Sequence, residues 1–409
     1  MALEVSLEGA DPAVCRILEG ALAGRQVTAE EGAALLAARG RAMYMVGAVA
    51  DELRRRDAGE EATYVVNRNI NFTNVCVKQC GFCAFSRDHR KEEGYMLPAE
   101  EVARRAREAQ ELGATEVCIQ AGLPPGMDGD LYEGICRAIK EAAPGIHIHG
   151  FSPEEVAYGA RAAGVGIEEY LGRLRDAGVG TLPGTSAEIL DQGIRDRISP
   201  GRLSADGWES IIRAAHGAGI RTTSTMMFGH VEEGIHRTRH IARIRSIQEE
   251  TGGFTEFVPL GFVHDEAPMY ADGRCARAGA DGPDVLLTHA VSRIMLHGII
   301  PNIQASWVKE GPALTQLLLW WGANDLGGTL INESISTSAG SGYGQLARPS
   351  EMRAMAAQEG RIPAERDTGY NILRRFGGGE GPEALDGADA SRFGSYAELV
   401  RSGRFRYSR

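Results

Sequence analysis

Three cysteines lie close together in the sequence at a spacing that suits a metal cofactor. Cys76, Cys80 and Cys83 are separated by three and then two residues in the segment NINFTNVCVKQCGFCAFSRDHR. Thiolates are soft ligands that suit iron–sulfur clusters or zinc. A structural zinc ion needs a fourth ligand, and His89 is a candidate, but no fourth cysteine lies nearby. Three thiolates on a four-iron cluster leave one iron open, and that iron can chelate the amino and carboxylate groups of a ligand.

The same segment matches the signature of enzymes that cleave S-adenosylmethionine at a [4Fe–4S] cluster. The signature is C-x3-C-x2-C with an aromatic residue before the last cysteine, and Phe82 supplies that residue. This predicts a radical enzyme with a [4Fe–4S] cluster and S-adenosylmethionine as cofactors. Two alternatives stay open at this point, a zinc-dependent hydrolase and a non-catalytic cluster-binding scaffold.

Alternating strands and helices must position these cysteines. From about residue 64, short apolar strands alternate with amphipathic helices in roughly eight units. This pattern favours an α/β fold, a radical S-adenosylmethionine (β/α)8 barrel of the TIM type, over a doubly wound open sheet. We expect a helical extension over residues 1–60, the barrel over 61–340 and a C-terminal cap over 341–409. The cysteines would then follow the first strand, at the barrel end where such enzymes carry their chemistry.

Two predicted strands carry polar side chains on one face only. In GIHIHG, His147 and His149 share a face, and in PNIQAS, Asn302, Gln304 and Ser306 share one. The outer face of a barrel strand packs on helices, so the polar faces should point into the lumen. A packed lumen would hold Val, Ile and Leu instead. We therefore expect a binding chamber, with a self-satisfied polar network as the alternative.

Other strand ends carry residues that could contact the cofactor. After the second strand, Gln120 and Gly122 of QAGLPP could bring backbone close to the methionine amino group. Glu188 follows the fourth strand, and His230 and Glu232 follow the fifth. Either carboxylate could hold the ribose hydroxyls or the amino group, or could instead cap a helix.

Longer stretches resemble one enzyme family over roughly residues 60–375. They include IQAGLPP, IHIHGFSPEEV, LPGTSAEILDQ, TTSTMMFGHVE, IQASWVKEG and NDLGGTLINESIS. The chain resembles the 5-amino-6-(D-ribitylamino)uracil–L-tyrosine 4-hydroxyphenyl transferases, a radical component of FO synthase in coenzyme F420 biosynthesis. The alternative is a radical enzyme of the futalosine route to menaquinone. Those enzymes carry Gly-Gly-Gly where this chain has Gly184, Thr185 and Ser186.

The resemblance implies a reaction. The reduced cluster would split S-adenosylmethionine into methionine and a 5′-deoxyadenosyl radical, which takes a hydrogen atom from tyrosine. The Cα–Cβ bond of tyrosine would then break, releasing 2-iminoacetate, and the 4-hydroxybenzyl group would add to C5 of the ribitylaminouracil. We also expect a separate ring-closing radical component of FO synthase as a partner, and flavodoxin or ferredoxin as the electron donor.

The resemblance also suggests roles for individual side chains. Candidates for hydrogen bonds to the ribityl chain and uracil are Asn302, Gln304, Ser306, Asn324 and Asn332. The tyrosine carboxylate needs a cation or backbone donors, and Arg202 and Lys309 are equal candidates for the cation. Candidates for proton transfer or for binding the phenol are His147, His149, His230 and His264. For each residue the alternative is a structural hydrogen bond.

Composition excludes several other classes of protein. The formal charge of −11 disfavours a nucleic-acid partner, which usually leaves a basic footprint. No apolar run approaches the ~20 residues that a membrane-spanning helix needs. The first residues, MALEVSLEGADP, lack the basic start and apolar stretch of a signal peptide. These features predict a cytoplasmic protein without membrane contact.

Overall fold

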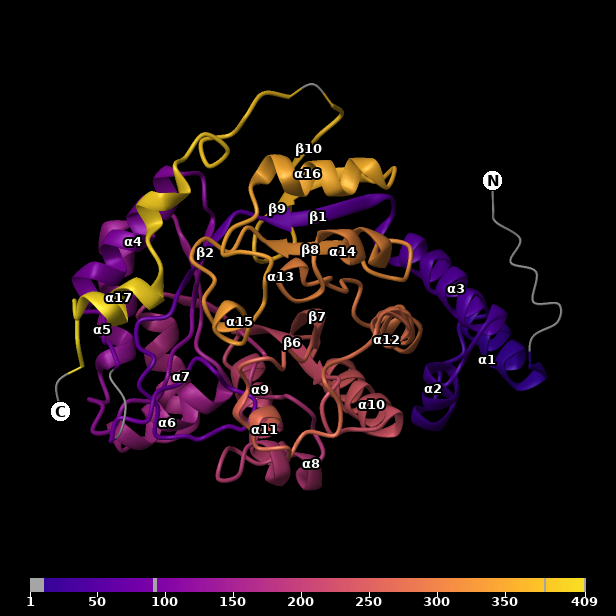
Figure 1. Ribbon diagram of the computed structural model, residues 1–409, viewed down its shortest axis with the longest axis horizontal. Helices are drawn as coiled ribbons and strands as arrows, with labels where there is room; N and C mark the ends of the chain where they lie inside the picture. The colour runs from indigo at the N-terminus through magenta and orange to yellow at the C-terminus, as the bar shows by residue number, and fades with distance from the viewer. Residues whose placement is uncertain (1–10, 91–93, 379, 408–409) are drawn as a thin grey trace.

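Parallel strands with helices between them organise most of the chain. The structure is a computed structural model that describes residues 11–90, 94–378 and 380–407 (Figure 1). Six strands form one sheet in the order of the sequence, and every neighbouring pair is parallel. They are β2 (Asn67–Ile70), β3 (Glu116–Ile119), β4 (His147–Gly150), β5 (Val179–Leu182), β6 (Arg221–Phe228) and β7 (Phe254–Gly261).

A second sheet completes the curve of the first. Its order is β10 (Ile372–Arg375), β9 (Ile362–Arg366), β1 (Glu61–Val65) and β8 (Asp325–Gly328), with β10 antiparallel to β9. Single parallel bridges connect the two sheets at Arg68–Ile331, Phe257–Ile303 and Gln304–Asp325. The predicted (β/α) barrel is thus confirmed as a partial one, because continuous strand pairing covers two curved sheets that only single bridges join.

The connecting helices have clear sequence signals. Helix α6 (Pro153–Ala163) begins at Ser152 with a capping box to Glu155 and ends at the left-handed Gly164. Helix α5 (Leu131–Ala142) buries its apolar side chains three and four residues apart, on one face. The other long connecting helices are α4 (Ala99–Glu111), α7 (Ile167–Asp176), α9 (Ala205–Gly217), α10 (Gly234–Thr251) and α12 (Gly282–Leu296), with the shorter α8 (Gln192–Ile198) between β5 and α9.

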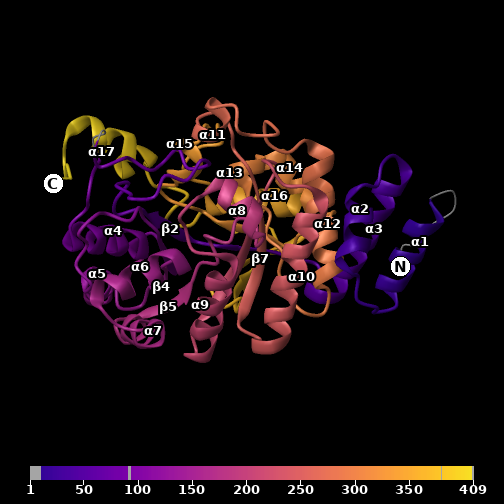
Figure 2. The same ribbon diagram turned by 90° about the horizontal axis from the view of Figure 1, so that it is seen from below.

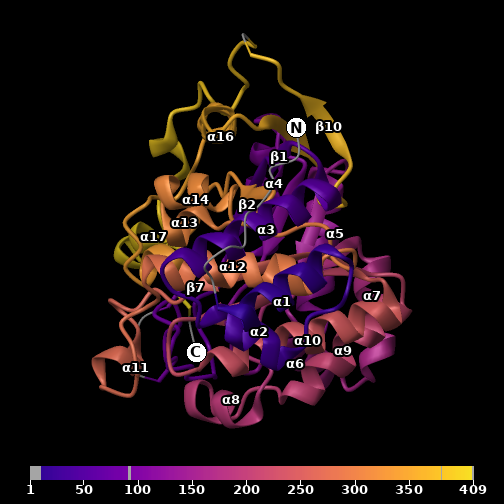
Figure 3. The same cartoon turned by 90° about the vertical axis from the view of Figure 1, so that its right-hand side faces the viewer.

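The N-terminal helices form a separate layer on one side of the barrel. They are α1 (Pro12–Leu22), α2 (Ala29–Leu36) and α3 (Arg41–Ala58). Helix α2 packs on α10, and α3 packs on α12 (Figures 2 and 3). Their apolar side chains join one buried cluster with those of α10 and α12. These helices coincide with the predicted extension, although the exact domain boundary stays a prediction. None of the helices among the described residues is long and apolar enough to span a bilayer.

The C-terminal residues do more than cap the barrel. After α16 (Pro349–Gln358) the chain adds β9 to the free edge of β1, and α17 (Tyr396–Ser402) then reaches α4 (Figure 1). There the Tyr396 ring lies against the Arg105 guanidinium. An edge strand presents unpaired backbone groups, which β9 satisfies here. The end of β9 also reaches the barrel at the end where the strands begin: Arg366, the last residue of β9, pairs with Asp325, the first residue of β8.

Candidate active site

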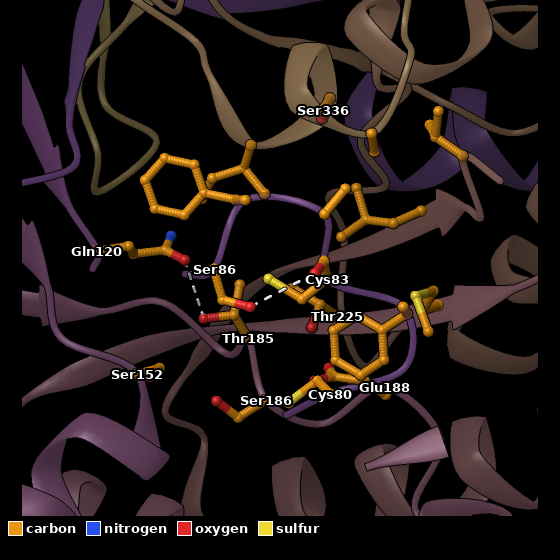
Figure 4. Close-up of a pocket in the computed structure, with 18 of the residues that line it drawn as sticks. Cys80, Cys83, Ser86, Gln120, Ser152, Thr185, Ser186, Glu188, Thr225 and Ser336 are labelled. Atoms are coloured by element: carbon orange, nitrogen blue, oxygen red, sulfur yellow. Dashed lines mark hydrogen bonds between the residues drawn. The ribbon is translucent and has the colours of Figure 1, made fainter. Parts of the chain in front are cut away.

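A cavity of about 370 Å³ opens where the barrel strands end. The segments after β2, β3, β4 and β5 line it, together with residues 304–309 and the segment after β8. We call this space the upper cavity. Figure 4 shows its polar residues, with Gln120 and Thr185 hydrogen-bonded to each other across two strand ends. The site therefore lies at the barrel end predicted from the position of the cysteines.

All three signature cysteines line the upper cavity. They belong to the loop after β2, in which the amide of Cys76 donates to Arg87 and the amide of Gly81 donates to Ile198. Burial raises the pKa of Cys76, and it raises the pKa of Cys80 to about 12. These thiols therefore stay protonated until a metal displaces their protons.

The arrangement of the thiols suits a cluster with several irons. Among the described residues, no three His, Cys, Asp or Glu side chains converge on a single metal ion. The three thiols nevertheless line one cavity, and a [4Fe–4S] cluster gives each thiolate an iron of its own. The donor type and the shared cavity thus fit the cluster. His89, the other possible ligand, does not belong to this lining.

Arg202 connects the cysteine loop to two carboxylates. Its Nη1 lies 2.7 Å from Glu188 Oε1 and 3.6 Å from Cys80 Sγ. Its Nε lies 3.4 Å from Glu154 Oε2, and Nη2 donates to Ser186 Oγ at 2.7 Å. The charge of this guanidinium is therefore already neutralised on the cysteine side of the cavity.

The loop after β5 holds Glu188 in an unusual backbone conformation. Ser186 and Glu188 have positive φ angles of 70° and 42°, which cost a non-glycine residue of order 1–3 kcal/mol. The amide of Met227 fixes this loop by donating to the Glu188 carbonyl at 2.8 Å. Gly184 is required beside it, because a Cβ there would lie 2.2 Å from the Thr223 carbonyl. The strain is concentrated at the residues that line the cavity.

The strand ends of β3 and β4 are tied together by Glu155. This carboxylate accepts from the Ala121 amide at 3.0 Å and from Ser152 Oγ at 2.6 Å. Burial raises the pKa of Glu155 to about 7. Gly122 lies in the same turn, and a Cβ at that position would meet the Val75 carbonyl at 2.3 Å. Its missing side chain thus lets the turn pack on the cysteine loop, while its predicted contact with the cofactor stays a prediction.

The lumen below the upper cavity is a second, smaller space of about 160 Å³. We call it the lower chamber. The two spaces share wall residues, among them Gln120, Thr185, Thr225, Gln304 and Ser306. The wall of the lower chamber also includes His149, Glu116, Glu256, Arg366 and Thr368. The lumen is therefore polar and hollow, as the polar strand faces predict.

The lower chamber holds titratable groups in unusual states. Burial lowers the pKa of His149 to about 4, so its imidazole is neutral at pH 7, with Nδ1 2.7 Å from Thr181 Oγ1. Burial also raises the pKa of Glu256 to about 7. Glu256 accepts a hydrogen bond from the Tyr370 hydroxyl, which the C-terminal segment brings in.

The structure brings many of the predicted side chains to this connected space. Those that line the upper cavity are Phe82, Gln120, Gly122, Glu188, Arg202, Gln304, Ser306 and Lys309, and His149 lines the lower chamber. Placement alone does not establish a role for any of these residues, so their roles stay predictions.

Seven other candidates line neither the upper cavity nor the lower chamber: His147, Glu232, His230, His264, Asn302, Asn324 and Asn332. Most have structural partners instead. Asn302 and Asn324 bond to each other, and Asn324 also accepts from Arg293. Asn332 accepts from Arg68 and holds the carbonyls of residues 393 and 394. Glu232 pairs with Arg237 and Arg277.

The remaining three histidines also have other contacts. His147 Nε2 lies 2.8 Å from Thr181 Oγ1. His230 is fully buried beside Glu232, and His264 packs against the Tyr270 ring.

Sequence reasoning overlooked several charged wall residues. Glu154 and Glu155 follow β4 directly, and their position in a helix-capping pattern suggests a purely structural role. Their position just after a strand end could have identified them as wall residues, because the same position makes Glu188 a candidate. Arg366 could not be found in this way, because nothing local indicates that a residue after the barrel returns to its lumen.

Two family models match consecutive parts of the chain. The radical SAM superfamily matches residues 70–243, and the CofH/MqnC C-terminal region matches residues 251–375. The first match contains the cysteine loop and the strand ends that line the upper cavity. This match rules out the alternative of a zinc-dependent hydrolase, and it implies a [4Fe–4S] cluster with S-adenosylmethionine as cofactors.

Curated relatives define the family more closely. The 5-amino-6-(D-ribitylamino)uracil–L-tyrosine 4-hydroxyphenyl transferase of Methanothermobacter thermautotrophicus is 49% identical over 358 residues, or 88% of this chain and 97% of that protein. The enzyme of the same name from Methanocaldococcus jannaschii is 51% identical over 327 residues, or 79% of this chain and 91% of that protein. The chain belongs to this transferase family. It is therefore a radical S-adenosylmethionine enzyme, and the resemblance noted in the sequence is confirmed.

Other comparisons concern a larger relative and the fold. This 4-hydroxyphenyl transferase family member is 48% identical to the FO synthase of Mycobacterium tuberculosis over 88% of the chain but only 42% of that protein. Methylornithine synthase has a TM-score of 0.66 at 20% identity, covering 85% of this chain and 97% of that one. The maturase HydG from Carboxydothermus hydrogenoformans has a TM-score of 0.68 at 16% identity, covering 87% and 80%. At these identities the two structures support the partial radical SAM barrel alone.

Proposed function

We propose that this chain transfers the 4-hydroxybenzyl group of L-tyrosine to C5 of 5-amino-6-(D-ribitylamino)uracil. The Cα–Cβ bond of tyrosine breaks, and the benzyl carbon forms a bond to C5. The other products are 2-iminoacetate, methionine and 5′-deoxyadenosine. The adduct is a precursor of FO, the deazaflavin of coenzyme F420. Relatives that carry the transferase name and share about half of their residues with this chain support the proposal.

One structural observation carries the proposal: the cysteine thiols and the polar lumen belong to one connected space. The upper cavity and the lower chamber share Gln304, Ser306 and Thr225 as wall residues. A reactive species made beside the cysteines can thus reach a substrate in the lumen without crossing bulk water. A hydroxyl-rich substrate also matches a wall of amides, hydroxyls and carboxylates.

The cluster and S-adenosylmethionine supply the radical that takes a hydrogen atom from tyrosine. The protein must hold the two substrates in register and exclude competing reactions. Cys76, Cys80 and Cys83 would hold the cluster. Gln304 and Ser306, which line both spaces, would bind the ribitylaminouracil. His149, neutral because burial lowers its pKa to about 4, can accept or donate a hydrogen bond without adding charge to the chamber.

The further partners are also proposals. We propose that a separate radical component closes the deazaflavin ring. The larger FO synthase of M. tuberculosis, of which this chain matches 42%, supports a link to a second activity. We further propose that flavodoxin or ferredoxin supplies electrons and that the enzyme works in the cytoplasm, where cysteine ligands stay reduced.

The proposal is tested by product analysis. The purified protein, with its cluster reconstituted anaerobically, is incubated with dithionite, S-adenosylmethionine, tyrosine and the ribitylaminouracil. We expect a hydroxybenzylated adduct and 5′-deoxyadenosine by mass spectrometry. Cys80→Ala should abolish both products.

Two outcomes would overturn the proposal. The first is 5′-deoxyadenosine without any adduct when both substrates are present. The second is an adduct formed with a futalosine-pathway substrate in place of the ribitylaminouracil. The matching family model spans CofH and MqnC proteins, so comparing the two substrates distinguishes an FO-synthase transferase from a futalosine-pathway enzyme.

A further inference from the structure

Three cationic side chains occur among the described residues of the upper cavity wall, namely Lys78, Arg202 and Lys309. Two of them are already neutralised. The Lys78 ammonium contacts the Gly201 carbonyl and lies 3.4 Å from Glu154. Arg202 pairs with Glu188 and Glu154. Any new anion would have to compete with these carboxylates for either of them.

Lys309 differs from both. Within the described part of the chain, its ammonium has no hydrogen-bond or ion-pair partner, although the residue lines the cavity. Glu333 and Glu310 attract the ammonium electrostatically, but their oxygens accept hydrogen bonds from backbone amides. Glu333 accepts from the Ser336 amide at 2.8 Å, and Glu310 accepts from the Gly261 amide at 3.1 Å. Lys309 thus offers an ammonium that Glu333 and Glu310 attract but that no described residue contacts directly.

The backbone beneath Lys309 is held rigidly. Lys309 belongs to the single turn α13 (Trp307–Glu310), and the Trp307 indole donates to the Gly328 carbonyl of β8 at 2.9 Å. Glu310 ties the other end of the turn to Gly261, the last residue of β7. A cation on a fixed support loses little entropy when it binds an anion.

The surroundings of Lys309 match one of the two substrates. The same cavity is lined by apolar side chains, among them Val308 beside Lys309 in the chain and Leu260 and Phe262 on either side of Gly261, which Glu310 contacts. A carboxylate next to an apolar wall is what an aromatic amino acid requires, whereas the ribitylaminouracil carries no carboxylate. S-adenosylmethionine has a carboxylate too, but it must bind at the cluster, and Arg202 rather than Lys309 is the cation beside a cysteine: its Nη1 lies 3.6 Å from Cys80 Sγ.

We infer that Lys309 binds the carboxylate of tyrosine, while Arg202 serves the cofactor side of the cavity. This inference rests on the proposed function, and it separates two residues that the sequence leaves equivalent. Burial lowers the pKa of Lys309, so a substrate carboxylate would also relieve the cost of keeping the ammonium charged in this wall.

The test compares tyrosine with tyramine, which lacks only the carboxylate. In the reconstituted holoenzyme, Lys309→Met should raise the KM for tyrosine about 30-fold or more, because an anion loses its buried partner. The same variant should handle tyramine about as well as the wild type does. KM values for the ribitylaminouracil and S-adenosylmethionine should change less than about threefold. Lys309→Arg should recover part of the tyrosine affinity.

A control and a binding measurement keep the inference falsifiable. Lys140→Met removes a lysine whose ammonium bonds to Ile146 outside the cavity wall, and it should leave the KM for tyrosine unchanged. Iron content and melting temperature show that each variant has folded. If the wild type forms no adduct, the proposed function fails, yet the binding of labelled tyrosine to wild type and Lys309→Met still tests the inference. Equal tyrosine affinity in the two, or a selective loss of S-adenosylmethionine affinity, would overturn it.

Discussion

At the scale of single residues, the charges around the cavity divide into two groups. Arg202, Glu188 and Glu154 form a paired network beside Cys80, whereas the Lys309 ammonium makes no ion pair with any residue that the structure describes. Buried charges without partners are costly, so an unpaired one inside a cavity indicates a ligand. The network beside Cys80 instead fixes a guanidinium and a carboxylate in one geometry, which we propose serves the cofactor.

Glu188→Gln should weaken the binding of S-adenosylmethionine about tenfold or more, because Arg202 loses its closest partner and its orientation. Equilibrium binding to the cluster-loaded protein measures this effect. Glu232→Gln is the matched control, since Glu232 is also a buried partner of arginines but lies outside the cavity wall. It should lower stability and leave the affinity intact. A Glu188→Gln variant with affinity within twofold of the wild type would refute the role of Glu188.

At the scale of elements, the turns after the strands build the site by packing on each other. In the turn after β3, the Leu123 carbonyl accepts a hydrogen bond from the Val77 amide, and the Gly122 amide donates one to the Thr73 carbonyl. It therefore supports the cysteine loop from below, and the absence of a side chain at Gly122 permits this contact.

Gly122→Ala should lower both iron occupancy and melting temperature, because its Cβ would lie 2.3 Å from the Val75 carbonyl. Gly134→Ala is the comparison, since a Cβ there meets nothing within 4 Å on helix α5. It should be neutral or stabilising by up to about 1 kcal/mol. Iron analysis and thermal melts of the two variants measure the difference. Equal iron content in both would contradict this account of the turn.

The alternation of polar residues along a strand predicts which face of the sheet each residue occupies, but not its position along the barrel axis. Of Asn302, Gln304 and Ser306, predicted to share a face, only Gln304 and Ser306 line the cavity. Asn302 lies lower and bonds to the Thr255 carbonyl. His147 and His149 differ in the same way. The sequence period gives the side of the sheet, whereas the position along the barrel axis depends on how the strands are staggered.

At the scale of the whole molecule, the C-terminal segment returns to close the lower end of the lumen. Local patterns predict the strand–helix units, because each unit carries its own apolar periodicity and caps. They do not predict that β9 joins β1 or that Arg366 meets Asp325, since these contacts join segments distant in the sequence. For this reason the sequence does not predict that the Arg366–Asp325 ion pair lies at the lower end of the lumen.

Arg366→Met should lower the free energy of unfolding by about 3–5 kcal/mol, because Asp325 stays buried without its charged partner. Arg375→Met breaks an ion pair with Glu61 that is largely exposed, and it should cost no more than about 1 kcal/mol. Urea unfolding of both variants measures the contrast. Similar losses of unfolding free energy in the two variants would show that the buried Arg366–Asp325 pair stabilises the protein no more than an exposed pair does.

Buried neutral histidines should make the protein sensitive to acid. Burial lowers the pKa of His289 to about 4 and that of His240 to about 3, from an unfolded value near 6.5. Between those values the unfolded chain binds more protons at these histidines, so their contribution to stability is complete above pH 6.5 and falls as the pH drops towards 4. His289→Gln should reduce the slope of stability against pH in this window by about one proton. An unchanged slope would show that His289 does not contribute.

The central claim is that tyrosine is split between its Cα and Cβ atoms and that the benzyl part moves to the ribitylaminouracil. The most direct measurement uses tyrosine labelled with carbon-13 at either atom. We predict that the Cβ label appears in the adduct and the Cα label in 2-iminoacetate, detected as glyoxylate after hydrolysis. Both labels in one product, or both left in tyrosine while 5′-deoxyadenosine accumulates, would contradict the account.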